Sequence, residues 1–169
     1  MLRWKSAHVT YVLSMKPLKI ASEENRMRWI CSRSIRATPE RVFRAVADPK
    51  EFNNAVSEGA GVEYLTALHE GVGTKFRATR MVRGKPQAFD QEVTEFVPPR
   101  AITLVNVTHG TKWESRITVE AVEEGAVVTL TMDAISDRLM ARVMNRLIAP
   151  MLQRALDKDL LAVKSYCEK

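Results

Sequence analysis

The sequence has only two cysteines and three histidines, and neither residue type forms a cluster. Cys31 and Cys167 lie far apart with no CxxC spacing, so we expect a reduced, cytoplasmic protein in which each thiol is a small buried hydrophobe. His8, His69 and His109 are isolated, so no metal site is expected. The glycine patterns of nucleotide-binding loops and the nucleophile elbow are also absent, and no cofactor is expected.

Long apolar runs are absent as well, so stable membrane insertion is not expected. The formal net charge is +6, but Arg3, Lys5, Lys16 and Lys19 fall within the first 22 residues, which contain no acidic residue. Because no basic patch is interleaved with aromatic residues, nucleic-acid binding is not expected. A hydrophobic content of 46% and a charged content of 27% are typical of one soluble globular domain.

Residues 1–25 differ from the rest of the chain. Val9–Met15 is a short apolar run behind basic residues, which is similar to a signal peptide, but no small-residue cleavage site follows in register. A basic, acid-free start is also similar to a transit peptide. We interpret residues 1–25 as a flexible extension, or as the product of an upstream start codon with the natural chain beginning at Met15 or Met27. Residues 26–169 then form the single globular domain.

One long helix is predicted over Asp137–Cys167, with Ser136 and Asp137 as N-cap residues and a kink at Pro150. Apolar residues keep the i, i+3, i+4, i+7 spacing for about eight turns and predict one buried stripe. The stripe consists of Met140, Val143, Met144, Leu147, Ile148, Met151, Leu152, Ala155, Leu156, Leu160, Val163 and Cys167.

Strands dominate the chain before this helix. The first is predicted over Met27–Arg36, with Met27, Trp29, Cys31 and Ile35 on one side. Thr38 as cap and Pro39 as first residue predict a helix, and a second short helix is predicted over Pro49–Asn54. Further strands are predicted at 62–68, 74–82, 87–97, 101–108, 111–122 and 126–134, separated by short Gly or Pro turns. The fold class predicted is α+β, with a seven-stranded antiparallel sheet.

Alternation along the strands predicts which side chains face the helix. Counting across the turns places Arg80 opposite Phe89, Ala78 opposite Gln91, Phe76 opposite Val93, Asn106 opposite Trp113, Leu104 opposite Ser115 and Ile102 opposite Ile117; Val128, Leu130 and Met132 complete the face. This face is mostly apolar, but Arg80, Gln91, Asn106 and Ser115 fall on it. A water- or ligand-filled cavity would accommodate them. Alternatively, Arg80 lies at the rim and pairs with Glu95 or Asp90.

Several segments carry a resemblance to a known family. They are Ile35–Phe43, Ala47–Pro49, Gly71–Phe76, Glu92–Arg100 and Leu156–Lys164. Together with the order of the elements, they resemble the polyketide cyclase/dehydrase-like branch of the START-related (SRPBCC) superfamily over residues 27–169. The resemblance implies a helix-grip fold, in which a curved sheet wraps around the C-terminal helix and leaves a tunnel for a hydrophobic ligand. Phe52-Asn53-Asn54 departs from the family pattern, in which many relatives carry a tryptophan after the second helix.

We therefore expect the protein to bind a small hydrophobic, lipid- or polyketide-like ligand, and a homodimer is left open. The ligand-binding residues predicted are Phe76, Arg80, Phe89, Gln91, Asn106, Trp113, Met140 and Met144. An alternative is a cyclase or dehydratase that uses the same tunnel. In that enzyme Arg80 would stabilise an enolate or carboxylate, and Asp90 or Asp133 would have to act as base although both fall on the convex side.

A third hypothesis concerns the basic side of the last helix. Arg138, Arg142 and Arg146 follow one another at four-residue steps and would dock on anionic lipid or on an acidic partner, or would simply face water. The three hypotheses require different features. An enzyme needs a titratable group in the tunnel, a carrier needs an unfilled tunnel volume, and a docking protein needs an exposed apolar patch.

Overall fold

The computed structural model describes residues 25–169 apart from 57, 58 and 83, so the extension predicted for the N-terminus lies outside the described residues except for Asn25. The described residues form one antiparallel sheet in the order β1-β7-β6-β5-β4-β3-β2. Its strands are β1 (Arg26–Ile35), β2 (Gly59–Tyr64), β3 (Lys75–Val82), β4 (Lys85–Val97), β5 (Ala101–Thr108), β6 (Thr111–Val122) and β7 (Gly125–Ile135). The helices are α1 (Pro39–Ala47), α2 (Pro49–Ala55) and α3 (Leu139–Cys167).

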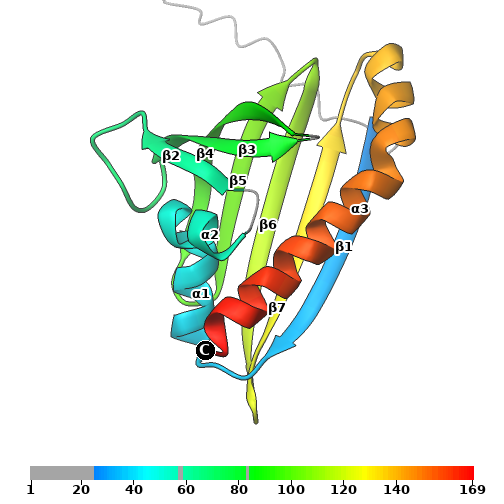
Figure 1. Cartoon of the computed structure of the whole chain (residues 1–169). Helices are drawn as coiled ribbons and strands as arrows, with labels where there is room; N and C mark the ends of the chain where they lie inside the picture. The colour runs from blue at the N-terminus through cyan, green and yellow to red at the C-terminus, as the bar shows by residue number, and fades with distance from the viewer. Residues whose placement is uncertain (1–24, 57–58, 83) are drawn as a thin grey trace, which may run out of the picture.

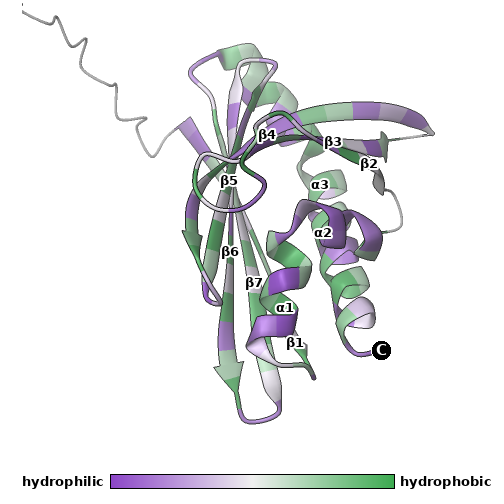
Figure 2. Ribbon diagram, turned by 90° about the vertical axis from the view of Figure 1, so that its left-hand side faces the viewer, coloured by the Kyte–Doolittle hydropathy of each residue, from purple (hydrophilic) through white to green (hydrophobic). Residues whose placement is uncertain are grey.

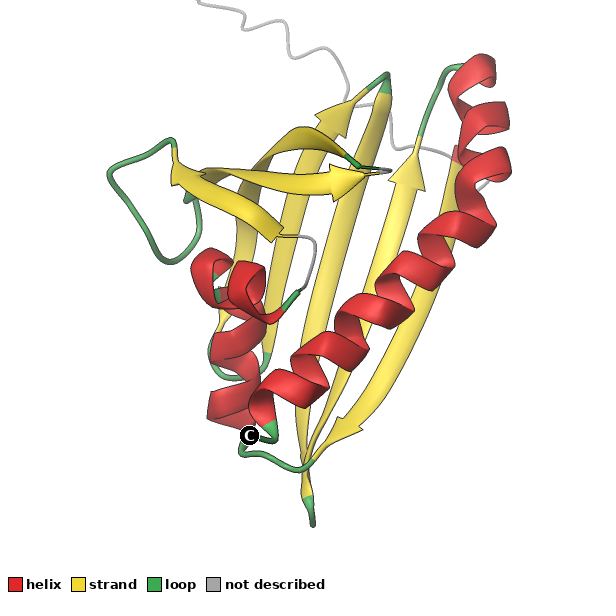
Figure 3. Cartoon of the chain, viewed as in Figure 1, coloured by secondary structure: helices red, strands yellow, loops and turns green. Residues whose placement is uncertain are grey.

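All three helices lie on one side of this sheet. Figure 2 shows the long strands nearly edge-on, with α1, α2 and α3 on one face and with β2 and β3 arching over the same face. The colouring by element type in Figure 3 shows α3 running diagonally across the sheet, with α1 and α2 beside its C-terminal half. The helix-grip architecture and the seven-stranded sheet expected from the sequence are confirmed.

The two short helices begin as expected from their capping residues. The Thr38 hydroxyl oxygen accepts a hydrogen bond from the Arg41 backbone N–H at 3.3 Å, and Pro39 is the first helical residue. Asp48 ends α1 and caps α2, where its carboxylate accepts from the backbone N–H groups of Lys50 and Glu51. This arrangement turns the chain so that α2 covers the sheet beside β2.

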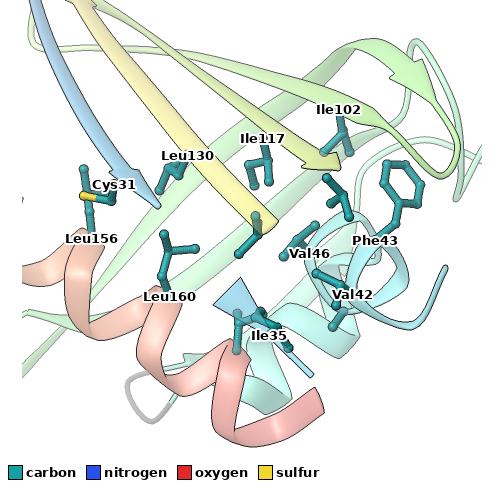
Figure 4. Packing of buried hydrophobic residues seen from close by; sticks show 14 of the residues in the cluster. Cys31, Ile35, Val42, Phe43, Val46, Ile102, Ile117, Leu130, Leu156 and Leu160 are labelled. Carbon is teal, nitrogen blue, oxygen red and sulfur yellow. The ribbon is translucent and has the colours of Figure 1, made fainter. Parts of the chain in front are cut away.

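The core lies between the C-terminal half of α3, α1 and the long strands. Figure 4 shows Leu156 and Leu160 of α3 directed at the strands, with Ile117 and Leu130 facing them from the sheet. Val42 of α1 is fully buried in the same cluster. The two cysteines are buried and free, as expected. The sheet and three helices therefore share one hydrophobic core.

The long helix differs from its prediction at its start. It begins at Leu139, not at Asp137, because the Ser136 hydroxyl donates to the Gly110 carbonyl oxygen and accepts from the Arg138 backbone N–H. Arg138 takes the N-cap position without a side-chain cap. The helix continues through Pro150, as predicted.

The predicted single stripe is wrong for the N-terminal half of α3. Leu156, Leu160 and Val163 are buried as expected. In contrast, Met140 is 76% exposed and Leu147 is 71% exposed. The face that packs on the sheet in this half passes instead through Asn145, whose amide donates to the Thr111 hydroxyl oxygen at 3.2 Å.

The register between β5 and β6 is confirmed for every predicted pair, including Asn106 with Trp113. The predicted register between β3 and β4 is wrong by two residues. Val82 pairs with Lys85, so the turn lies one residue earlier in the sequence than predicted. Phe76 therefore pairs with Gln91, and Ala78 pairs with Phe89. A shift of two residues keeps every side chain on its face, so the assignment of faces survives the error.

The second strand also lies earlier than the predicted 62–68. Tyr64 is its last residue, because the Thr66 hydroxyl accepts from the Lys75 backbone N–H and donates to the Leu68 carbonyl oxygen. These hydrogen bonds replace the strand ladder, and the chain forms a loop up to β3.

The β3–β4 hairpin bends away from the direction of the long strands. Residues 85–91 of β4 pair only with β3, whereas β4 pairs with β5 from Glu92 onward, and the register shifts between Val93 and Glu95. Such a bulge bends a strand and increases its twist. Figure 1 shows the result: β3 crosses the direction of β5 to β7, and its C-terminal end is directed towards α3.

Candidate functional site

A cavity of about 120 Å³ lies between the bent sheet, α1, α2 and α3. Most of its wall is apolar and comes from all of these elements. The lining residues are Val46, Ala47, Pro49, Phe52, Asn53, Val56, Val62, Phe76, Ala78, Arg80, Gln91, Leu104, Ser115, Ile117, Leu130, Met132, Leu156, Asp159 and Leu160.

The charged groups of this wall are Arg80 and Asp159, which form a two-pronged ion pair. One guanidinium nitrogen of Arg80 donates to Asp159 Oδ1 at 2.7 Å and the other donates to Oδ2 at 2.9 Å. The Asp159 side chain is 7% exposed and that of Arg80 is 29% exposed. Such a bidentate pair fixes both side chains and connects β3 to α3. It therefore ties the bent hairpin to the long helix beside the cavity.

Three uncharged polar side chains share the wall with this pair: Asn53 of α2, Gln91 of β4 and Ser115 of β6. They come from different elements and converge on an otherwise apolar space. A few placed polar groups in an apolar cavity are typical of sites that bind and orient small molecules. Because the Asp159 carboxylate neutralises the Arg80 guanidinium, the lining residues that the structure describes carry no net charge.

Of the predicted site residues, Phe76, Arg80 and Gln91 line the cavity. Arg80 also takes a carboxylate partner, as the alternative interpretation required, but the partner is Asp159 and not Glu95 or Asp90. Glu95 accepts from Thr103 and Arg116 instead.

The other predicted residues lie elsewhere. Phe89 and Asn106 line a separate surface cleft of about 410 Å³ where β4 diverges from β5. Trp113 stacks on Trp29 with ring centroids 6.2 Å apart. Met140 and Met144 are exposed on α3 and outside the cavity. A ligand-binding role for these five stays a prediction.

The two carboxylates considered as catalytic bases do not reach the cavity. Asp133 is buried on the opposite face of β7, where Arg28 binds it through two hydrogen bonds. Asp90 pairs with Arg77, and this hydrogen bond lowers the pKa of the Asp90 carboxyl group.

The carboxylate that does face the cavity, Asp159, was missed by the sequence reasoning. A signal was present, because position 159 follows Leu156 by three residues and precedes Val163 by four, which places it on the buried side of the helix. The predicted stripe contained apolar residues alone, so a charged residue at that position was passed over.

The described residues show no other site of recognisable chemistry. Among them, no group of three His, Cys, Asp or Glu side chains is placed to hold a metal ion. Burial and the nearby Asp157 carboxylate raise the pKa of the Cys31 thiol, and Gln153 donates to its sulfur. Burial also raises the pKa of Cys167. Both thiols are therefore held in the neutral, unreactive form.

A curved antiparallel sheet that holds a long C-terminal helix across its concave face defines a helix-grip protein of the START-like class. The family model described as "Polyketide cyclase / dehydrase and lipid transport" matches residues 31–168. The chain belongs to this family.

Solved structures show the same fold at low sequence identity. The protein TTHA0849 from Thermus thermophilus is 19% identical, with a TM-score of 0.65 over 84% of this chain and 96% of that one. The major latex-like protein 151 from Panax ginseng is 13% identical, with a TM-score of 0.66 over 86% and 99%. The di-domain ARO/CYC StfQ from the steffimycin biosynthetic pathway is 10% identical, with a TM-score of 0.70 over 86% of this chain and 52% of that one.

A search of curated proteins finds no match to the chain. In the described part of the chain, none of the helices combines the length and apolar character needed to span a membrane.

Proposed function

We propose that the protein binds a small hydrophobic, lipid- or polyketide-like molecule in the cavity, with one uncharged polar group of the ligand placed at Arg80 and Asp159. The observation that carries this proposal is the bidentate Arg80–Asp159 pair in the wall of an otherwise mostly apolar cavity. Membership of the polyketide cyclase/dehydrase and lipid transport family supports the hydrophobic ligand class.

The charge balance of the pair decides the polar end of the ligand. A carboxylate ligand would bring a second negative charge next to Asp159, in a site where water screens charges less than at the surface. A carbonyl oxygen can accept from Arg80 or Gln91, and a hydroxyl can in addition donate to Asp159. A ketone or alcohol therefore fits better than a fatty acid.

The volume restricts the size of the ligand. Sites for drug-sized molecules measure about 300–1,000 Å³, whereas an engineered cavity of about 150 Å³ holds benzene. The cavity of about 120 Å³ accommodates a small ligand or one end of a larger one. A complete lipid or polyketide requires one wall to move.

The test begins with native mass spectrometry of protein purified from its own cells, followed by extraction of any bound compound. A medium-chain methyl ketone and the fatty acid of equal chain length then serve as calorimetric probes. We expect the ketone to bind at least about tenfold more tightly, which corresponds to about 1.4 kcal/mol.

Ala78 and Ala121 offer a matched pair of variants. Ala78→Phe fills the cavity and should abolish ketone binding, whereas Ala121→Phe adds the same side chain at an exposed position of β6 outside the cavity and should not. Equal binding by both folded variants would refute the cavity as the binding site. Tighter binding of the acid would refute the uncharged ligand end.

A cyclase or dehydratase is the second candidate, and the specific observation in its favour is Asp159. The enzyme needs a titratable group in the cavity, and this carboxylate lies there. Asp159 would accept a proton from carbon next to a ligand carbonyl whose oxygen Arg80 polarises. Incubation of the extracted compound with protein should then give a cyclised or dehydrated product, and Asp159→Asn should bind that compound without converting it.

A further inference from the structure

The N-terminal half of α3 presents an apolar surface to solvent. We call it the α3 apolar patch: Leu139, Met140, Val143, Met144, Leu147 and Met151, each between 43% and 76% exposed. Met140, Met144, Leu147 and Met151 follow one another at alternating steps of four and three residues, so they form one row on the helix. Over 139–151 the patch is about 18–20 Å long. A contiguous apolar surface of this kind marks a contact site for another molecule.

The helix segment that carries the patch contains charges of one sign, and the nearest carboxylates in the sequence, Asp137 and Asp157, lie just outside its two ends. Residues 138–156 contain four arginines and no Asp or Glu. Arg146 is exposed beside the patch, and exposed Arg154 continues its row three residues after Met151. Arg142 differs from the sequence-based expectation, because it is half-buried and donates to the Asn25 side chain.

We infer that the α3 apolar patch docks on the surface of an anionic lipid bilayer. A helix with exposed Met, Leu and Val side chains bordered by arginines lies in the interface of such a membrane, with its apolar face among the acyl chains and its guanidinium groups at the lipid phosphates. Arginine stems reach from the apolar region to the headgroups. The docking is peripheral, with α3 parallel to the surface and its opposite face still packed on the sheet.

A second copy of the chain fits the same patch less well. A two-fold contact would place the arginines of both copies near one another, and residues 138–156 supply no carboxylate to pair with them. An anionic surface compensates these charges, so charge complementarity selects the bilayer.

The patch and the cavity share one element. Leu156 and Leu160, which line the cavity, lie about one to three turns after Met151 on α3. Docking of the N-terminal half would bring this wall close to the bilayer, from which a hydrophobic molecule could enter. The docking itself does not depend on the proposed ligand.

The test is flotation of the full-length protein with two kinds of vesicle: pure phosphatidylcholine, and phosphatidylcholine with about one third phosphatidylserine. We expect partition onto the anionic vesicles that weakens when salt is raised to about 0.5 M. Leu147→Glu should reduce this partition about tenfold or more, because it places a charge within the patch. Val107→Glu is the matched control, since Val107 is 74% exposed on β5, away from α3.

Arg146→Glu should also weaken flotation, and Arg44→Glu on the exposed side of α1 should not. Absence of binding to anionic vesicles would overturn the inference. So would equal loss in Leu147→Glu and Val107→Glu, or unchanged binding by Leu147→Glu, which would assign vesicle binding to another part of the chain.

A photoreactive benzoylphenylalanine in place of Leu147 identifies the occupant directly. Adducts with lipid, mapped by mass spectrometry in the presence of anionic vesicles, would support the inference. Adducts with a second copy, or with residues 1–24 of the same chain, would overturn it.

Discussion

At the scale of single residues, the site depends on one ion pair whose members come from distant parts of the sequence. Strand alternation was sufficient to predict that Arg80 and Gln91 face the helix, because an error of two residues in the register leaves the faces unchanged. Asp159 was not predicted as a site residue, because the buried face of α3 was identified from its apolar residues alone. The pairing of Asp159 with Arg80 could not be predicted either, since it depends on the bend in β4.

One substitution in the Arg80–Asp159 pair should change which ligand the cavity prefers. Asp159→Asn removes the negative charge that disfavours an acidic ligand and keeps the positive charge of Arg80 beside the cavity. We expect the fatty-acid probe to bind about tenfold more tightly to this variant than to the wild type, and the ketone to lose its advantage. Calorimetric titration of both probes checks this.

The control for this prediction is Asp157→Asn, two residues earlier on α3, where the carboxylate pairs with Arg33 and does not line the cavity. Its ligand preference should stay that of the wild type. If Asp159→Asn still prefers the ketone, the charge balance of the pair does not select the ligand.

Trp113 shows that a correct face assignment does not identify every neighbour of a side chain. It lies on the concave face, as predicted, but stacks on Trp29 outside the cavity. Trp113→Ala should therefore lower the free energy of unfolding by about 3 kcal/mol through lost packing and stacking, while ketone affinity of the folded variant stays within about twofold. Urea unfolding and calorimetry measure the two quantities. A loss of binding without a loss of stability would return Trp113 to the site.

At the scale of elements, the three helices are joined by a small polar cluster. The Tyr166 hydroxyl of α3 donates to the Glu51 carboxylate of α2 at 2.8 Å, and Arg41 of α1 donates to the same oxygen at 3.2 Å. Arg41 also lies over the Tyr166 ring, 4.7 Å from its centroid. The hydrogen bond from Tyr166, reinforced by Arg41, lowers the pKa of Glu51. The cluster holds α2, and with it one wall of the cavity, against α1 and α3.

The lowered pKa of Glu51 makes the stability of the folded protein depend on pH in the acidic range. A carboxyl group whose pKa is lowered by folding stabilises the native state above its unfolded pKa and loses that contribution as the pH falls through its folded pKa. Glu51→Gln should therefore cost about 1 kcal/mol near neutral pH, and this difference from the wild type should disappear between about pH 5 and pH 3. Denaturant unfolding at several pH values tests it.

Glu124→Gln in the exposed β6–β7 turn removes a carboxylate without such partners among the described hydrogen bonds and should change stability little at any of these pH values. A Glu51→Gln difference that persists at pH 3 would show that packing, not the ionised carboxylate, carries the contribution.

Element boundaries followed from local chemistry wherever capping residues act alone, as at Thr38 and Asp48. The N-terminal half of α3 was harder to predict, since its apolar row has the periodicity of a buried stripe but lies on the exposed side. Periodicity identifies an apolar face, but it does not identify what covers that face. The sheet leaves this half of the row uncovered because Asn145, and not Met144, contacts Thr111 of β6.

At the scale of the whole molecule, the bulge in β4 shapes the site. It directs the β3–β4 hairpin across the concave face, so that Arg80 reaches α3 and the cavity is closed on that side. The order of elements predicts a sheet around a helix but not the depth of its curvature, because alternation is unchanged by a bend. The volume of the cavity could therefore not be predicted from the sequence.

The same architecture indicates which wall yields to a larger ligand. The strands are fixed by ladder hydrogen bonds and α3 by the Arg80–Asp159 pair. The helix α2 is held by the hydrogen bonds to Glu51, but Pro49 is the one fully buried residue among its seven. Phe52 of this helix lines the cavity and is half-buried. Phe52→Ala enlarges the cavity at its most adaptable side. We expect affinity to rise about fourfold for each further methylene of a methyl ketone that the new space admits.

The matched control is Phe43→Ala in α1, because Phe43 is buried, packs edge-on against Phe96 at 5.6 Å and does not line the cavity. Both variants should lose about 2–4 kcal/mol of stability, since both remove a packed ring. Only Phe52→Ala should shift the calorimetric chain-length optimum to longer ketones. An equal shift in Phe43→Ala would mean that loosened packing anywhere admits the ligand, and an unchanged optimum in Phe52→Ala would mean that the binding space lies away from α2.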